Sequence, residues 1–155
     1  MLSRSNIPRN LLMSEDEKTA ANYVQSRGYT IEEHQGAVST YILEQSRLNS
    51  SGASASGNLP YIKTWSLQEN EPDNYFGKEI SSYTFIVSGH PLDKQYNTHT
   101  KVSIMMVDGK VVGGTSSPDV DADGGPYDLD GRTLEEVTGI SLEQWREQWD
   151  QKYNN

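Results

Sequence analysis

The stretch that decides the fold is Lys101–Thr115, KVSIMMVDGKVVGGT. Two strand-like runs, 101–107 and 110–115, flank the dipeptide Asp108-Gly109. An Asp-Gly pair between two such runs is a strong signal for a type I′ turn, because both central positions of that turn need a positive φ. The stretch therefore predicts two antiparallel strands joined by a tight hairpin.

Further strands are predicted before this hairpin. Residues 80–88 place Tyr83, Phe85 and Val87 on one face, and Gly89-His90-Pro91 ends the run. Residues 29–44 alternate around the turn signal Gln35-Gly36 and predict a second hairpin. A helix over 37–48 is the competing interpretation, because apolar residues there also recur with a helical period.

Helices are predicted at both ends of the chain. Ser14 with Glu17 forms a capping box, and Gly28 follows the last turn, which indicates a helix over 15–27. Thr133 with Glu136 and Ser141 with Gln144 are two further capping boxes in series. The last helix carries one apolar stripe, formed by Leu142, Trp145, Trp149 and Tyr153. We expect its tryptophans to pack against the sheet.

This order of elements, without β-α-β alternation, predicts an α+β fold with a mainly antiparallel sheet of about five to six strands. An N-terminal helix and the Trp-bearing C-terminal helix pack on that sheet. Residues 14–155 form a single domain after a flexible tail, 1–13. Within the domain, 49–58 (NSSGASASGN) is of low complexity and predicts a mobile loop with nothing to bury.

Composition narrows the possible functions. The chain of 155 residues has a net charge of −9 and a mean hydropathy of −0.74. Such an acidic protein repels phosphate backbones, so nucleic acid is not an expected partner. No apolar run reaches the ~20 residues that span a bilayer, so no transmembrane segment is expected. The absence of cysteine excludes disulfides, cysteine nucleophiles and thiolate metal sites.

The densest carboxylate cluster predicts a calcium site. Asp119, Asp121, Asp123 and Asp130 fall at positions 1, 3, 5 and 12 of a loop with Gly124 at position 6, the pattern of calcium loops. The candidate ligands are Asp119, Asp121, Asp123, Gly125 and Asp130. Three departures weaken the match. Position 12 is Asp in place of Glu, position 8 is Pro126, and the segment before the loop looks like a strand in place of a helix. The alternative is an acidic surface turn.

Little in the sequence points to catalysis. His34, His90 and His99 have no zinc-ligand spacing, and Gly113-Gly114-Thr115-Ser116-Ser117 is not a nucleophile elbow. His90 with Asp93 is a candidate acid–base pair, and the alternative is a histidine beside a turn.

Three segments and the C-terminal run resemble a known family. They are Tyr75–Ile80, Ser88–Leu92 and Val107–Gly114, followed by Leu129–Gly139 and the Trp-bearing helix. Together these residues, about 59–153, resemble small domains of predicted lipoproteins from Bacillus-like Gram-positive bacteria, of the DUF4830 type. The resemblance implies an extracytoplasmic, membrane-tethered domain without known catalytic residues. MLSRSNIPRNLLM is not an intact secretory signal, so it is either a disordered tail or the remnant of a processed precursor, and the resemblance favours the second interpretation.

The resulting expectation is a non-catalytic extracytoplasmic interaction domain with an unknown protein or cell-envelope partner, stabilised by a weak calcium site. The alternative is a small hydrolase that uses His90 with a nearby carboxylate. An interaction domain predicts an exposed apolar patch or an open groove. A hydrolase predicts His90 in a deep pocket that faces a second ionisable group.

Overall fold

A computed structural model describes residues 13–120 and 126–154. In chain order the elements are α2 (Glu15–Ser26), β1 (Thr30–Ile42), η2 (Gln45–Leu48), α3 (Ala55–Ser66), η3 (Pro72–Tyr75), β2 (Glu79–Ser88), α4 (Leu92–Tyr96), β3 (Thr100–Val107), β4 (Lys110–Pro118), β5 (Tyr127–Asp128), α5 (Leu134–Thr138) and α6 (Leu142–Tyr153). The predicted tail, 1–13, lies outside the described residues except for Met13. Among the helices described, none has the length and apolar content needed to cross a membrane.

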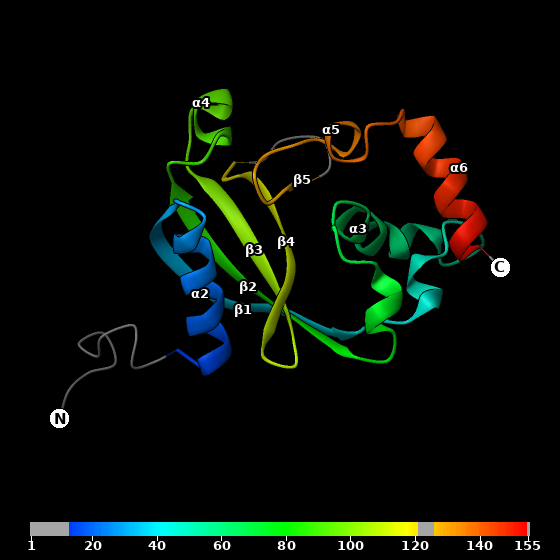
Figure 1. The fold of residues 1–155 in the computed structure, drawn as a ribbon, viewed down its shortest axis with the longest axis horizontal. Helices are drawn as coiled ribbons and strands as arrows, with labels where there is room; N and C mark the ends of the chain where they lie inside the picture. The colour runs from blue at the N-terminus through cyan, green and yellow to red at the C-terminus, as the bar shows by residue number, and fades with distance from the viewer. Residues whose placement is uncertain (1–12, 121–125, 155) are drawn as a thin grey trace.

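The described strands form one antiparallel sheet in the order β1-β2-β3-β4-β5 (Figure 1). This confirms the predicted α+β fold with an antiparallel sheet. The predicted hairpin is also confirmed, since Val107 pairs with Lys110 and both Asp108 (φ 51°) and Gly109 (φ 77°) have the positive φ of a type I′ turn. The strand predicted over 80–88 corresponds to β2.

The hairpin predicted over 29–44 is wrong, and so is the competing helix over 37–48. Residues 30–42 form one long edge strand, β1, which pairs with β2 along its whole length. The register of this pairing shifts in three places, one of them between His34 and Gly36. Gly36 has φ 79°, so its turn-like conformation is accommodated as an irregularity within the strand. Only a short 3-10 helix, η2, follows within the proposed helical range.

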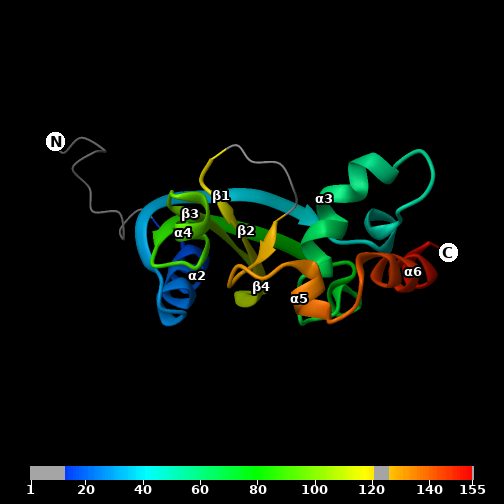
Figure 2. The same ribbon diagram turned by 90° about the horizontal axis from the view of Figure 1, so that it is seen from above.

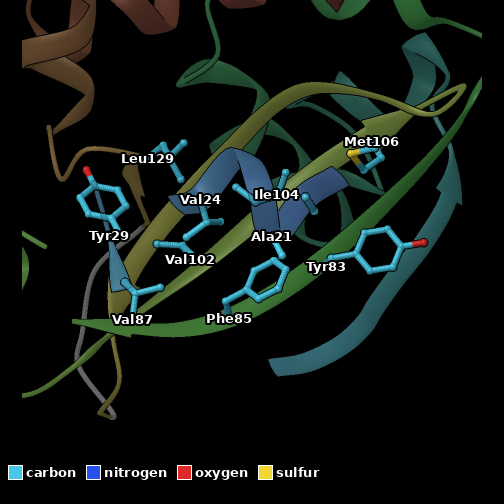
Figure 3. Packing of buried hydrophobic residues seen from close by; sticks show 11 residues of the cluster. Ala21, Val24, Tyr29, Tyr83, Phe85, Val87, Val102, Ile104, Met106 and Leu129 are labelled. Carbon is cyan, nitrogen blue, oxygen red and sulfur yellow. The ribbon is translucent and has the colours of Figure 1, made fainter. Parts of the chain in front are cut away.

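One face of the sheet is covered by α2. Ser14 caps this helix by accepting a hydrogen bond from the Glu17 amide at 3.1 Å, as predicted. The hydrophobic cluster beneath α2 is shown in Figure 3, where side chains of the helix and of the strands point toward one another. Its fully buried members include Ala20, Val24, Phe85, Val102 and Ile104. This face is therefore closed by a single helix.

A second cluster lies on the opposite face, because alternate residues of a strand point to opposite sides. It joins Ile80, Met105, Val107 and Val112 of the sheet to Trp65 of α3 and to Trp149 and Tyr153 of α6. The packing predicted for the C-terminal helix is thus confirmed for Trp149. Figure 2 shows α2 and α6 at opposite ends of the molecule.

The segment 49–58 differs from its prediction. Ala55 begins α3, so the last four residues of the segment form the first turn of a helix. Asn58 is buried, and its side-chain amide donates to the carbonyls of Ser46 (2.9 Å) and Asn49 (3.0 Å). The expectation that this segment has nothing to bury is therefore wrong at Asn58. The composition concealed the helix, since Gly57 and Pro60 both disfavour helical structure.

Candidate functional site

The predicted calcium ligands are only partly within the described chain. Asp121, Asp123 and Gly125 lie outside the described residues. Asp119 is exposed just beyond β4, where its amide donates to the carbonyl of His99 at 3.0 Å. In the parts of the chain that are described, no three His, Asp or Glu side chains gather in a way that could hold a metal ion.

The carboxylate of Asp130 is held by groups from the α2 side of the molecule. Its Oδ1 accepts a hydrogen bond from the Tyr29 hydroxyl at 2.6 Å, and its Oδ2 pairs with the Arg27 guanidinium. Burial raises the pKa of Tyr29, and the hydrogen bond to Asp130 raises it further. Asp130 therefore ties the chain after β5 to the end of α2.

Asp119 and Asp130 lie on opposite sides of the β4–β5 pairing. Thr115 of β4 pairs with Asp128, which precedes Asp130 by two residues. Asp119 lies four residues beyond Thr115 in the other direction, about 13 Å of extended chain. This register separates the two ends of the predicted loop along β4. Because Asp121, Asp123 and Gly125 lie outside the described residues, the calcium site stays a prediction.

Asp128 was not among the candidate ligands, yet it is the buried carboxylate of this region. Its Oδ1 accepts from the amides of Asp130 (3.0 Å) and Arg132 (2.7 Å), and its Oδ2 accepts from Arg132 Nε at 2.7 Å. The hydrogen bond from Arg132 Nε to the Asp128 carboxylate raises the pKa of the Arg132 guanidinium. These contacts close a tight turn, a role that Asp-x-Asp-Gly sequences commonly have.

His90 is buried in a backbone framework. Its Nδ1 accepts a hydrogen bond from the Leu92 amide at 3.1 Å, so the proton lies on Nε2, which donates to the carbonyl of Leu129 at 2.8 Å. Asp93 accepts from the amides of Gly89 and His90 and from the Thr100 hydroxyl. Both groups thus stabilise the turn between β2 and α4.

A polar cleft of about 160 Å³ lies beside β4, and two of its side chains, Gln68 and Asn70, form hydrogen bonds to the backbone of β4. The Gln68 side chain accepts from the Gly114 amide and donates to the Gly114 carbonyl, both at 2.9 Å. A Cβ on Gly113 would lie 2.2 Å from Gln68 Oε1, so this glycine permits the approach. The Gly113-Gly114 pair therefore has a packing explanation.

A groove of about 610 Å³ lies between α3 and α6, with α5 and β5 at one end. We call it the α3–α6 groove. Its apolar lining consists of Leu59, Ile62, Leu67, Pro126, Tyr127, Leu134, Leu142, Trp145 and Trp149. This volume is within the roughly 300–1,000 Å³ of ordinary ligand sites.

The two walls of the groove are built alike. α3 contributes Leu59, Ile62 and Lys63, and α6 contributes Leu142, Trp145 and Arg146, with the same i, i+3, i+4 spacing in each helix. Leu59 and Leu142 are each 47% exposed, an unusual degree of exposure for two large aliphatic side chains that face one cavity. The rim is thus apolar on both sides.

Trp149 gives the groove a fixed floor. Its indole N–H donates to the carbonyl of Leu48 at 2.9 Å, and its ring is 5.3 Å from the ring of Trp145. Trp145 is only half-buried. One tryptophan is therefore anchored in the core while the next presents a face to the groove.

Comparisons with models of known protein families, with curated proteins and with solved structures find no match to this chain. The helical stripe of α6 was visible in the sequence. The opposing wall was not, because α3 begins in the low-complexity segment that was predicted to be a loop.

Proposed function

We propose that this protein is a non-catalytic binding domain that holds an apolar part of a partner in the α3–α6 groove. The observation that carries the proposal is the pair of half-exposed leucines, Leu59 and Leu142, on opposite walls of one open cavity. Water around exposed apolar surface is displaced favourably when a partner covers it, at about 25 cal/mol for each Å². Two such side chains facing one cavity favour a binding site over scattered surface leucines.

The setting is part of the same proposal. We take the domain to act outside the cytoplasm, tethered to a membrane in its precursor, with a protein or cell-envelope partner. This location is supported only by the motif resemblance of residues 59–153. A weak stabilising calcium ion has less support, since Asp130 is already held by Arg27 and Tyr29.

The hydrolase alternative is less well supported than binding. A general base must be able to take up a proton from a substrate. The Nδ1 of His90 already accepts the Leu92 amide, and His90 does not line the α3–α6 groove. Asp93 is engaged with two amides and a hydroxyl.

The groove can be tested with an apolar dye such as 8-anilinonaphthalene-1-sulfonate, whose fluorescence rises on apolar surfaces. We expect the folded protein to bind the dye, and the double variant Leu59→Glu/Leu142→Glu to lose most of that binding. Both side chains are half-exposed, so the fold should tolerate the change. Far-UV circular dichroism checks this.

Ile42→Glu/Val120→Glu is the matched control. Ile42 is 41% and Val120 is 50% exposed, and neither lines the groove, so this variant adds the same two carboxylates at exposed apolar sites elsewhere. Its dye binding should equal that of the wild type. Equal losses in the control and in the groove variant would contradict the proposal, as would unchanged binding in a folded groove variant.

A further inference from the structure

The charges on the groove walls specify the partner further. The inference below rests on the proposed function and adds the chemistry of the occupant. Lys63 on α3 and Arg146 on α6 stand at the same place in their walls, four residues after Leu59 and Leu142. Within the described chain neither cation forms an ion pair or a hydrogen bond. Two cations without a partner among the described residues therefore line the same cavity, one from each wall.

The acidic lining groups lie toward the ends of the groove. Asp150 is one turn beyond Arg146, and its Oδ1 already accepts the Ser50 hydroxyl at 2.5 Å. Glu135 comes from α5, next to the beginning of α6. From α5 to the end of α6 the charged lining residues thus follow the order Glu135, Arg146, Asp150, which is negative, positive, negative. A partner bound in the groove should therefore carry two negative charges halfway along its length, one next to Lys63 and one next to Arg146.

The shape of the groove favours a helix as the occupant. Each wall runs for nine residues, Leu59–Leu67 and Leu142–Asp150, so its first and last Cα atoms are about 12 Å apart at a rise of about 1.5 Å per residue. The cavity is open along its length and bounded by the sides of two helices. An amphipathic helix laid between them presents side chains at i, i+3, i+4 and i+7 to such a surface.

We propose that the α3–α6 groove binds the apolar face of an amphipathic helix whose acidic residues, flanking the centre of that face, pair with Lys63 and Arg146. The net charge of −9 opposes an acidic partner at long range. At physiological ionic strength this repulsion is screened within about 8 Å, so the two cations at the contact determine the local preference. The ion pairs select the partner, and the apolar contact supplies most of the affinity.

The test uses two synthetic peptides that differ only in charge. Both carry leucines at i, i+3, i+4 and i+7, lack aromatic residues and are held helical by a lactam bridge, because short free helices are marginal in water. One has glutamates at the two central flanking positions and the other has lysines there. By calorimetric titration we expect the acidic peptide to bind roughly 10-fold more tightly, a preference that falls with added salt.

Two double variants replace two cations by glutamate, one variant inside the groove and the other outside it. Lys63→Glu/Arg146→Glu should reverse the preference, so that the lysine peptide binds better. Lys94→Glu/Lys110→Glu makes the same change of net charge at two exposed lysines outside the groove and should leave the preference unchanged. A preference that shifts equally in both double variants reflects only net charge and would overturn the inference.

Further outcomes separate this inference from the proposed function. Dye binding in the groove without binding of either peptide would refute the helical occupant and leave the groove proposal intact. Equal binding of the acidic peptide and of a version with a central proline, which cannot remain helical, would also refute it. Concentration-dependent dimers in sedimentation that Leu59→Glu/Leu142→Glu dissolves would identify a second copy of this chain as the occupant and overturn the inference.

Discussion

The two faces of the sheet differ in how completely they are closed. Under α2 the cluster combines small and aliphatic side chains with Phe85 and two tyrosines, Tyr29 and Tyr83, and contains no tryptophan (Figure 3). The helix contributes alanines that let its backbone lie close to the strands. On the opposite face α3 and α6 contribute tryptophans and tyrosines, and an open groove remains between the two helices. The first face has the features of a structural core. The second combines a core with a binding surface.

Hydrogen bonds from the indole N–H and phenol O–H groups of these rings explain why the second face keeps an open groove. Trp149 Nε1 donates to the carbonyl of Leu48 and Trp65 Nε1 donates to the Tyr41 hydroxyl, each at 2.9 Å. Tyr153 donates to Asp73 Oδ1 at 2.6 Å. Buried tryptophan and tyrosine normally find such partners, and the partners fix where each ring lies. Rings held in this way keep α3 and α6 in place without filling the space between them.

The largest expected effect separates the anchored tryptophan from its neighbour. Trp149→Ala removes a buried ring and its hydrogen bond to Leu48, so it should lower the free energy of unfolding by about 3–5 kcal/mol. Trp145→Ala removes a half-buried ring on the groove wall and should cost about 1 kcal/mol while weakening dye binding. Urea unfolding measures both changes. Equal costs would mean that Trp145 belongs to the core and that the groove wall is misassigned.

The sequence predicted the regular parts of the fold through strong local signals. Asp108-Gly109 defined the β3–β4 hairpin, and the capping boxes at Thr133 and Ser141 are both present in the structure. The prediction from sequence failed at Gly36, because glycine is used both in turns and in irregular positions within a strand. Gly36 has the positive φ of a turn but lies within a continuous strand, so the hairpin predicted around it was wrong.

The candidate site was predictable only in part. The stripe of Leu142, Trp145 and Trp149 was visible, but which of these side chains are covered depends on α3, whose helical character the low-complexity segment concealed. In the acidic loop, by contrast, the sequence signal was visible but the tertiary contacts of its residues were not. Its spacing fits calcium ligands, whereas the engagement of Asp130 by Arg27 and Tyr29 depends on tertiary contacts over more than a hundred residues of chain.

A smaller loss of stability is expected when the contacts of Asp130 to Arg27 and Tyr29, on the α2 side of the molecule, are weakened. Asp130→Asn weakens the contacts to Arg27 and Tyr29 and should cost about 1 kcal/mol, a value reduced for the partial exposure of the pair. The cost should be the same with calcium and with a chelator, since the contacts are to protein groups. Asp119→Asn, at an exposed position, should change stability little. A cost of Asp130→Asn that appears only with calcium would restore the metal-loop interpretation.

The smallest expected effect concerns one tyrosine on each side of the molecule. Tyr29 donates to Asp130 and Tyr153 to Asp73, both at 2.6 Å. In both residues burial raises the pKa of the phenol, and the hydrogen bond to the carboxylate raises it further. Above about pH 10, the pKa of an unfolded tyrosine, the unfolded chain loses the proton that the folded protein keeps. The free energy of unfolding contributed by each hydroxyl is therefore fully present below that pH and is lost as the pH rises.

Tyr29→Phe and Tyr153→Phe should each be slightly less stable than the wild type at pH 8, by under about 1 kcal/mol. The difference in free energy of unfolding between the wild type and each variant should become smaller above pH 10, because only the wild type then loses the contribution of the hydroxyl. Urea unfolding between pH 8 and pH 11 measures this. Tyr75→Phe is the control for loss of a hydroxyl alone, since the Tyr75 hydroxyl has no hydrogen bond to the described residues. If the stability difference from the wild type narrows above pH 10 for Tyr29→Phe but not for Tyr153→Phe, the Tyr153–Asp73 hydrogen bond is exchanged for bonds to solvent, whereas the Tyr29–Asp130 hydrogen bond is kept.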